Sequence, residues 1–348
     1  DPVMSIERPI PLKGSPASPY TRKMLAVLRY RRIPYRFLVG TNGPMGDLPR
    51  PKVDLLPTFY LPDAEGRLEA VVDSSPIIRR LEHEVAGRAV VPADPVVAFV
   101  DALLEDYADE WLTKAMFHYR WHYAADIDKA GGILPRWRDI TAPEDALAQL
   151  KAQFSARQIG RLGVVGSNPG TAAVIEGSYL HLLDALAAHF TRHPFLMGRR
   201  PGASDFGFYG QLTQLTHFDP TPSALTLTHA PRVYAWVDLV EDLSGLEPSD
   251  ADWVARDALA TTLGPILAEV GRTYVPVMIA NARALKAGAD VVRTEVGGRP
   301  WEQQPFPYQG KCLQWLREGF AALDPADRAD VDTLLEGAGC GALLHAPV

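Results

Sequence analysis

The sequence predicts an α/β domain at the N-terminus, residues 1–86, followed by an all-helical region, residues 95–348. The chain has 348 residues, which exceeds the usual size of a single domain. Strand and helix signals alternate over residues 8–86. Strand signals then fade after Gly87–Pro95, a Pro-containing segment that we interpret as a linker.

Short apolar segments and helix-start signals give the N-terminal domain the order β-α-β, loop, β-β-α. The expected strands are Ile10–Leu12, Tyr35–Val39, Thr58–Leu61 and Leu68–Val72. Ser18-Pro19 predicts the start of the first helix, because Ser is a favoured N-cap and Pro suits the first helical position. Ser75-Pro76 repeats this signal for the second helix. Residues 40–54 are rich in Gly and Pro, so we expect them to be mostly loop.

Helical patterns dominate the rest of the chain. The expected helices cover residues 95–123, 144–160, 171–192, 203–217, 231–243, 251–286 and 310–337. Residues 124–143 and 288–309 contain Gly and Pro, and we expect them to be connections.

The composition is that of a globular protein, and it argues against several classes of function. Apolar residues make up 47% and charged residues 22% of the chain. The net charge of -7 argues against non-specific binding of nucleic acid, which needs clustered Lys and Arg. Cys312 and Cys340 form no metal or redox motif and fit a reducing compartment. We see no apolar run of about 20 residues and no signal peptide, so we expect a cytoplasmic protein that does not enter a membrane.

The segment from Gly14 to Lys23 places a hydroxyl group at the start of a helix. A helix N-terminus has free backbone N–H groups and a partial positive charge, so it stabilises an anion such as a thiolate. The Ser18 hydroxyl is able to donate a hydrogen bond to that thiolate and lower its pKa, and Tyr20 is the second candidate hydroxyl. The alternative is that Ser18 only caps the helix.

Two further segments carry features of a peptide-binding site. Pro57 enters a strand, and a cis Leu56–Pro57 bond would expose the Leu56 backbone to pair with an extended peptide. Asp73 and Ser74 stand at the start of a helix, where a carboxylate can bind the N–H groups and the Ser74 hydroxyl, and an ammonium group can bind Asp73. Plain helix capping by Ser74 or Ser75 is the alternative interpretation.

Together, Ser18–Lys23, Leu56-Pro57 and Asp73-Ser74 resemble the N-terminal domain of the glutathione S-transferase superfamily, which has a thioredoxin-like fold. Ser18–Thr21 also looks like the CPYC active site of glutaredoxins with both cysteines replaced. The resemblance implies that Ser18 takes the catalytic position. It also implies that the Leu56 backbone, next to Pro57, pairs with the cysteinyl unit of glutathione. Asp73 and Ser74 would bind the γ-glutamyl end.

The resemblance extends over residues 8–245. Arg200–Gly207 resembles the buried helix start of the family's C-terminal domain, although Gly202 stands where the family usually has Ser or Thr. Asp205 remains able to support that helix start. Family members are usually shorter than this chain, so residues 246–348 are expected to form extra C-terminal helices. We call residues 246–348 the C-terminal extension.

The resemblance implies a glutathione S-transferase, or a related glutathione-dependent lyase or isomerase. Glutathione would be the co-substrate, a small apolar electrophile the second substrate, and the protein a homodimer without a metal. A non-catalytic binding module with the same fold is the alternative, because function belongs to sites rather than to folds.

The helix expected over residues 95–123 would border the second-substrate pocket in this family. Tyr107, Trp111, His118 and Arg120 are candidate wall residues, and core packing is the alternative for the aromatic ones. The same helix carries a polar stripe of Asp106, Glu110, Lys114, His118 and His122. His118 and His122 have the spacing to share a metal, but no third ligand is evident, and we favour a paired or solvated helix face. We interpret the aromatic segment Trp301–Tyr308 as a seal of the helical core, with a lid over the cleft as the alternative.

Overall fold

The computed structural model describes residues 6–39 and 46–348, so residues 40–45 of the loop expected over residues 40–54 lie outside the described residues, and residues 46–54 form neither helix nor strand. A four-stranded sheet with the order β2-β1-β3-β4 forms the centre of the N-terminal domain. The strands are β1 (Ile10–Lys13), β2 (Tyr35–Leu38), β3 (Thr58–Pro62) and β4 (Leu68–Val71). β1 pairs in parallel with β2 and antiparallel with β3, which pairs antiparallel with β4. This mixed sheet is thioredoxin-like, and all four strands lie where the sequence predicts them.

Two helices complete the N-terminal domain, α1 (Pro19–Arg31) and α2 (Ser74–Glu84). Ser18 caps α1, because its Oγ accepts the backbone N–H of Thr21 at 3.1 Å. The second helix begins two residues earlier than the Ser75-Pro76 signal predicts, with Asp73 at the N-cap position. A tertiary contact explains this shift, since the ammonium group of Lys23 holds the Ser74 hydroxyl at 2.9 Å.

The remainder of the chain is mostly helical. Its elements are α3 (Pro95–Tyr107), η2 (Ala108–Leu112), α4 (Thr113–His122), α5 (Ala124–Arg138), α6 (Glu144–Ile159), η3 (Leu162–Val165), α7 (Ala172–His189), α8 (Ala203–Thr213), η4 (Gln214–Phe218), α9 (Pro220–His229), α10 (Pro231–Val240), η5 (Asp250–Asp252), η6 (Arg256–Ala258), α11 (Leu259–Arg272), α12 (Tyr274–Ala287), β5 (Val292–Val296), β6 (Arg299–Gln303), α13 (Pro307–Ala321), α14 (Pro325–Gly337) and α15 (Ala342–His345). None of the helices in the described part of the chain is long and apolar enough to cross a bilayer.

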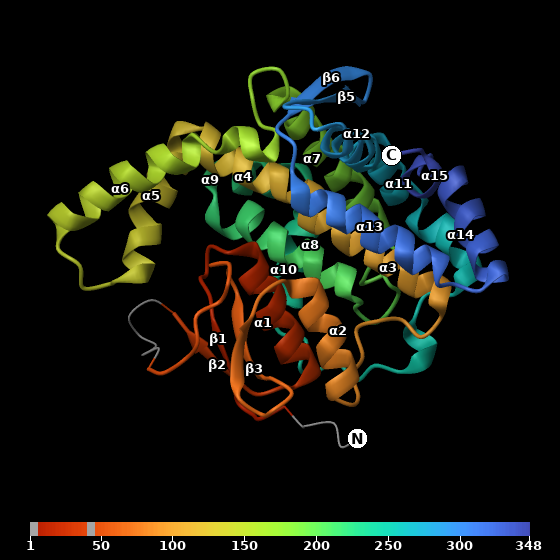
Figure 1. The fold of residues 1–348 in the computed structure, drawn as a ribbon, viewed down its shortest axis with the longest axis horizontal. Coiled ribbons are helices and arrows are strands. Elements are labelled where there is room, and N and C mark those ends of the chain that lie inside the picture. Colours follow the sequence, from red (N-terminus) through yellow and green to blue (C-terminus); the bar gives the residue numbers. More distant parts are fainter. Residues whose placement is uncertain (1–5, 40–45) are drawn as a thin grey trace.

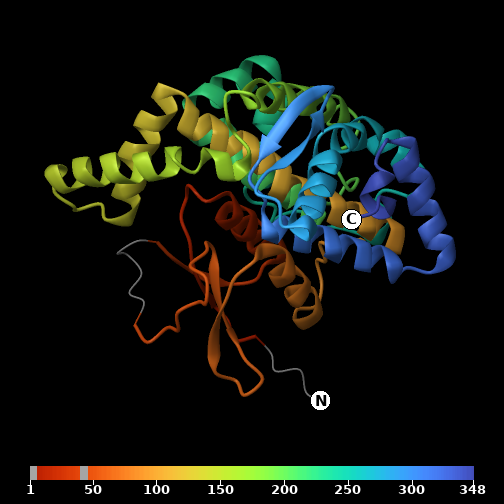
Figure 2. The ribbon, with the colours of Figure 1, turned by 45° about the horizontal axis from the view of Figure 1, so that its top comes forward.

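The helices form an arc above the N-terminal domain (Figure 1). The pair α5 and α6 projects at one end of the arc, and α13, α14 and α15 lie at the other end (Figures 1 and 2). α1 packs against α8, and α13 packs along α3. The C-terminal extension therefore covers the helix that the sequence places beside the candidate site.

Residues 124–138 form a helix, α5, where the sequence predicts a connection. Gly131 accounts for the difference. Its lack of a side chain lets α5 pack closely against α6, and it does not form a turn. A Cβ at this position would stand 2.6 Å from the Oγ of Ser155 on α6. Pro135 lies in the last turn of α5, and the helix ends at Arg138.

The C-terminal extension also differs from the prediction in two places. Residues 288–309 contain the antiparallel hairpin of β5 and β6, whose turn uses Gly297 and Gly298 at φ of 56° and 76°. Glycine adopts these angles without steric cost. The helix expected over residues 251–286 is divided at Thr273 into α11 and α12.

Asp205 organises the start of α8, which packs against α1. Its carboxylate accepts the backbone N–H groups of Leu196 at 2.6 Å and Gly202 at 2.9 Å. Asp101 of α3 supplies the cap oxygen that Gly202 lacks, because its Oδ1 accepts the N–H of Ser204 at 2.9 Å. A Cβ on Gly202 would stand 2.5 Å from this same Oδ1, so the neighbouring helix explains the departure from the family pattern.

We predict that Asp205→Ala lowers the free energy of unfolding by about 2–4 kcal/mol, because it leaves buried N–H donors without a partner. Urea denaturation checks this value. The matched control is Asp290→Ala, at an exposed aspartate, where we expect a change within about 0.5 kcal/mol. Equal effects of the two substitutions would contradict the role of Asp205.

Candidate functional site

Three segments that the sequence assigns to glutathione binding meet around the start of α1. The Oγ of Ser18 lies 3.5 Å from the carbonyl oxygen of Leu56, and the Leu56–Pro57 peptide bond is cis. On the other side, the Nζ of Lys23 lies 2.9 Å from the Oγ of Ser74. Residues from three separate segments thus gather at one end of a single helix.

The hydroxyl of Ser18 uses its two hydrogen-bonding functions separately. Its oxygen accepts the N–H of Thr21 as the helix cap, and its proton points to the carbonyl of Leu56 at 3.5 Å. The second distance is at the outer limit for a hydrogen bond, so the proton is weakly held. Capping the helix and donating to a thiolate are therefore compatible for this one side chain.

Arg120 and Gln214 hold the loop that leads to Ser18. The Nη1 of Arg120 donates to the carbonyl of Ala17 at 3.0 Å, and the Nε2 of Gln214 donates to the carbonyl of Pro16 at 3.0 Å. Arg120 is buried and forms an ion pair with Asp219 at 2.9 Å. Arg120 was expected to form a pocket wall, but the structure places it beneath the loop, where it positions the backbone.

Tyr20 points across the domain interface. Its hydroxyl donates to the backbone carbonyl of Asp109 at 2.6 Å. Burial, together with the nearby charge of Glu110, raises the pKa of Tyr20 well above its ordinary value, so the phenol stays protonated. The structure thus engages the hydroxyl of Tyr20 in a contact between domains, and Ser18 is the hydroxyl left beside Leu56.

Lys23 lies buried beside Ser74. Its ammonium group is 2.8 Å from carboxylate oxygens of Glu105 and of Asp109, and its side chain is 1% exposed. Burial opposes the charged form, but the two carboxylates outweigh this effect and raise the pKa of Lys23. A positive charge therefore persists next to the hydroxyl that the sequence assigns to a carboxylate subsite.

The C-terminal extension reaches the other residue of this subsite. The hydroxyl of Tyr308, in the first turn of α13, donates to the Oδ2 of Asp73 at 2.8 Å. Asp73 has a φ of 85°, a conformation that is unusual for a residue with a side chain and is often found at functional sites. Burial raises the pKa of Asp73, and the hydrogen bond from Tyr308 partly offsets this effect.

The polar stripe of α3, η2 and α4 is largely buried instead of solvated. Its partners come from the C-terminal extension: Asp106 accepts from Tyr274, Glu110 accepts from Gln309 and Lys114 donates to Gln303. Of the two alternatives for this helix face, paired or solvated, the structure shows a paired face at these positions, because about one hundred later residues fold back over the helix. Burial raises the pKa of Asp106 to about 7 and lowers the pKa of Lys114 to about 8.

The other expected wall residues also lie in the core. Tyr107 stacks against Phe208 with ring centroids 5.8 Å apart, and Trp111 packs against Trp301 at 5.2 Å. His118 is fully buried. Core packing, the alternative for the aromatic residues, is what the structure shows. Trp301 is fully buried in this core, whereas Tyr308, at the other end of the segment Trp301–Tyr308, contacts Asp73 of the candidate site.

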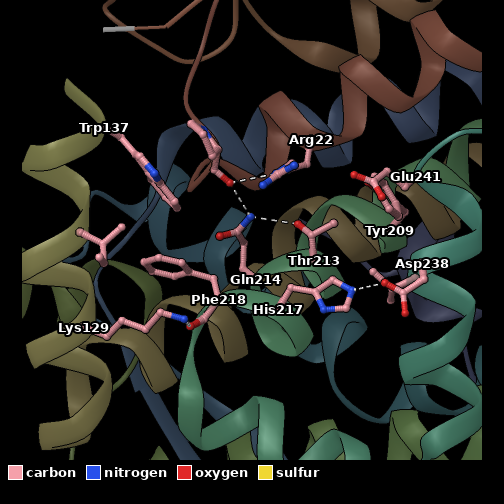
Figure 3. Close-up of a pocket in the computed structure, with 13 residues that line it drawn as sticks. Arg22, Lys129, Trp137, Tyr209, Thr213, Gln214, His217, Phe218, Asp238 and Glu241 are labelled. Atoms are coloured by element: carbon pink, nitrogen blue, oxygen red, sulfur yellow. Dashed lines mark hydrogen bonds and ion pairs between the residues drawn. The ribbon is translucent and has the colours of Figure 1, made fainter. Parts of the chain in front are cut away.

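A cleft with a volume of about 530 Å³ opens beside the loop before Ser18 (Figure 3). Its lining residues are Pro16, Arg22, Lys129, Ile133, Trp137, Tyr209, Thr213, Gln214, His217, Phe218, Val237, Asp238 and Glu241. Trp137 of α5 and Phe218 of η4 form an aromatic side with ring centroids 5.3 Å apart. The opposite side is polar, with His217 and Asp238 2.9 Å apart (Figure 3).

Sequence reasoning missed this cleft. Trp137 lies in the range that was expected to be a connection, and helix α5 brings it to Phe218. The spacing of Ile133 and Trp137, four residues apart, was the one local signal of an apolar helix face.

Residues 12–89 match the family model of the glutathione S-transferase N-terminal domain. This range contains the mixed sheet, Ser18, the cis Leu56–Pro57 bond and the start of α2. The N-terminal domain of this chain is therefore similar in sequence to that of glutathione S-transferases over residues 12–89.

Two solved structures similar to this chain are a glutathione S-transferase from Rhodospirillum rubrum F11 and a Tau class glutathione S-transferase from mango, Mangifera indica. The first has 16% identity and a TM-score of 0.41, and the match covers 72% of this chain and 98% of the other. The second has 18% identity and a TM-score of 0.40, with 72% and 96% covered. No curated protein sequence matches the chain significantly.

We predict that Asp106 makes the stability of the protein depend on pH. Its pKa rises from an ordinary value of 3.8 to about 7 on folding, so the folded state holds a proton that the unfolded state releases. The stabilisation is complete below about pH 4 and is lost as the pH rises through about 7. Asp106→Asn removes this titration and leaves an oxygen to accept from Tyr274.

Urea denaturation of both proteins at about pH 5 and about pH 8 measures the effect. The stability of the wild type, relative to Asp106→Asn, should fall at the higher pH. Asp290→Asn, at an exposed site, should show no such change relative to the wild type. The prediction would be contradicted if the free energies of unfolding of the wild type and of Asp106→Asn differed by the same amount at both pH values.

Proposed function

We propose that the protein is a glutathione-dependent transferase in which Ser18 stabilises the thiolate of glutathione. The observation that carries the proposal is the geometry of Ser18 at the N-terminus of α1. Its proton is weakly held by Leu56 at 3.5 Å, and its capping bond to Thr21 uses a different part of the hydroxyl. A thiolate at this position receives that proton's hydrogen bond and the partial positive charge of the helix.

Glutathione lies along the N-terminal domain in this proposal. Its γ-glutamyl ammonium group binds Asp73, and its carboxylate binds Ser74, where the buried charge of Lys23 at 2.9 Å from the hydroxyl favours an anion. The backbone of Leu56 pairs with the cysteinyl unit. These contacts place the sulfur near Ser18.

The second substrate is a small apolar electrophile. The cleft beside Pro16 and Arg22 supports this class of substrate, because Trp137 and Phe218 offer an aromatic side to an apolar or planar group. The thiol releases its proton to solvent, and the thiolate forms a bond from sulfur to the electrophilic carbon. The leaving group departs with its bonding electrons. Both cysteines are free and buried, which fits a cytoplasmic enzyme, and the family resemblance supports a homodimer.

We predict that Ser18→Ala lowers kcat/KM by about 10- to 100-fold, because a hydrogen bond to a charged group contributes about 1.5–3 kcal/mol. Conjugation rates over a panel of electrophiles measure the loss, and the pH dependence of the rate should shift to higher pH as the pKa of the bound thiol rises. Asp94→Ala is the matched control, since Asp94 also caps a helix with Pro at its first position, but on α3. Unchanged rates for Ser18→Ala would contradict the role of this hydroxyl.

A second candidate function is a non-catalytic binding module. The observation in its favour is that each predicted ligand-binding side chain already has a partner within the chain. Ser18 contacts Leu56, Ser74 contacts Lys23 and Asp73 contacts Tyr308. An absence of heat in a titration of the wild type with millimolar glutathione would favour the module over the transferase.

If glutathione binds as proposed, Asp73→Asn weakens its affinity about tenfold, because the ammonium group loses a charged partner. Tyr308→Phe is the control, since it removes the Tyr308–Asp73 hydrogen bond and keeps the carboxylate. We expect no loss of affinity for Tyr308→Phe in calorimetric titrations. Equal losses in the two variants would mean that Asp73 acts only by holding the C-terminal extension.

A further inference from the structure

A second cluster of polar side chains joins α4 to α7, apart from the segments that meet at Ser18. His118 and His122 lie one turn apart on α4, and Glu176 lies on α7. One possible ligand atom from each of the three residues lies within 4.8 Å of the others. The fold therefore supplies the third ligand that the sequence did not show beside the two histidines.

His118 is held by both of its ring nitrogens. Nδ1 lies 2.6 Å from the Oγ of Ser167, and Nε2 lies 3.0 Å from the Oε2 of Glu176. The hydroxyl of Ser167 is able to donate to an unprotonated Nδ1, which leaves the ring proton on Nε2 for Glu176. It is equally able to accept from a protonated Nδ1, which leaves Nε2 free to bind a metal.

Glu176 is oriented by a neighbour of the second histidine. Its Oε1 accepts the hydroxyl of Tyr123 at 2.7 Å, which leaves Oε2 facing His118. Tyr123 directly follows His122 at the end of α4. Metal-ligating His and carboxylate side chains are generally oriented by further hydrogen bonds, and in this cluster Ser167 and Tyr123 supply them.

His122 gives the cluster an open side. Its ring is exposed and stacks on that of His118, with centroids 4.7 Å apart and an angle of 23°. Bonds from Zn²⁺ to nitrogen and oxygen are about 2.0–2.2 Å long, so ligand atoms lie within about 4 Å of each other across the metal. Rotation of the exposed His122 side chain closes the remaining distance.

Two histidines four residues apart do not form a metal site by themselves, as a second pair in this chain shows. His189 and His193 have the same spacing, with ring centroids 5.3 Å apart. Both ring nitrogens of His189 face backbone carbonyl oxygens, of Thr262 at 3.1 Å and of Phe195 at 2.8 Å. The pair of His189 and His193 therefore serves as an internal control. In the cluster on α4, by contrast, a ring nitrogen of His118 faces the carboxylate of Glu176.

We propose that His118, His122 and Glu176 bind a divalent transition-metal ion of the Zn²⁺ type, with water completing its coordination. Two imidazoles and one carboxylate form a ligand set that Zn²⁺ and its neighbours in the first transition row accept. On binding, the ring proton of His118 moves from Nε2 to Nδ1, where the Oγ of Ser167 accepts it, and the metal links α4, α7 and the segment of Ser167. The site is independent of the proposed glutathione chemistry.

The test is a titration with Zn²⁺ of chelator-treated, full-length protein that carries no polyhistidine tag. We expect one ion per chain, and at least tenfold weaker binding for His122→Ala and for Glu176→Gln. His193→Ala is the matched control and should bind as the wild type does. His122 is exposed, so its substitution leaves the fold intact, which a thermal midpoint without metal verifies.

Two further measurements separate ligation from a structural effect. The thermal midpoint should rise with Zn²⁺ in the wild type and in His193→Ala, but not in His122→Ala. X-ray absorption of the zinc-loaded protein should show two imidazole ligands. Wild-type affinity in His122→Ala, or equal losses in His122→Ala and His193→Ala, would overturn the proposal.

Discussion

The buried ammonium group of Lys23 is the contact on which the arrangement of the candidate site depends. A charge removed from water is costly unless it is paired, and Lys23 is paired with Glu105 and Asp109 at 2.8 Å. The same group donates to Ser74 at 2.9 Å. One side chain of α1 therefore fixes the start of α2 and the middle of the long helix of the second domain. The interface between the domains and the γ-glutamyl end of the proposed site are thus stabilised by the same contacts.

The C-terminal extension completes this interface. The helix of α3, η2 and α4 carries carboxylates and a lysine that would be solvated without the extension, and side chains such as Tyr274 and Gln309 satisfy them. Tyr308 continues this cover to Asp73. The polar stripe then divides into two parts with different surroundings. Its first part is buried under the extension, and its end at His122 reaches solvent, where the proposed metal site lies.

Ser18 shows how one residue serves structure and chemistry together. As a cap it satisfies the N–H of Thr21, and this bond directs its oxygen toward the helix and leaves its proton near Leu56. The loop before it has no regular structure of its own to fix it, so Arg120 and Gln214 hold the carbonyls of Ala17 and Pro16. These contacts come from the helical domain, so the position of the hydroxyl depends on how the two domains pack.

The sequence by itself determined the features that depend on neighbouring residues. Ser18-Pro19 marks the start of α1 and the apolar segments mark β1 to β4, because capping and strand propensity act over a few residues. The position of Leu56-Pro57 before β3 follows in the same way. Only the tertiary structure decided that α5 is a helix, since Gly131 packs against Ser155. It also brought Trp137 to Phe218, Tyr308 to Asp73 and Glu176 to His118. These pairs are far apart in the chain, and their distances are set by the packing of whole helices, which no local pattern records.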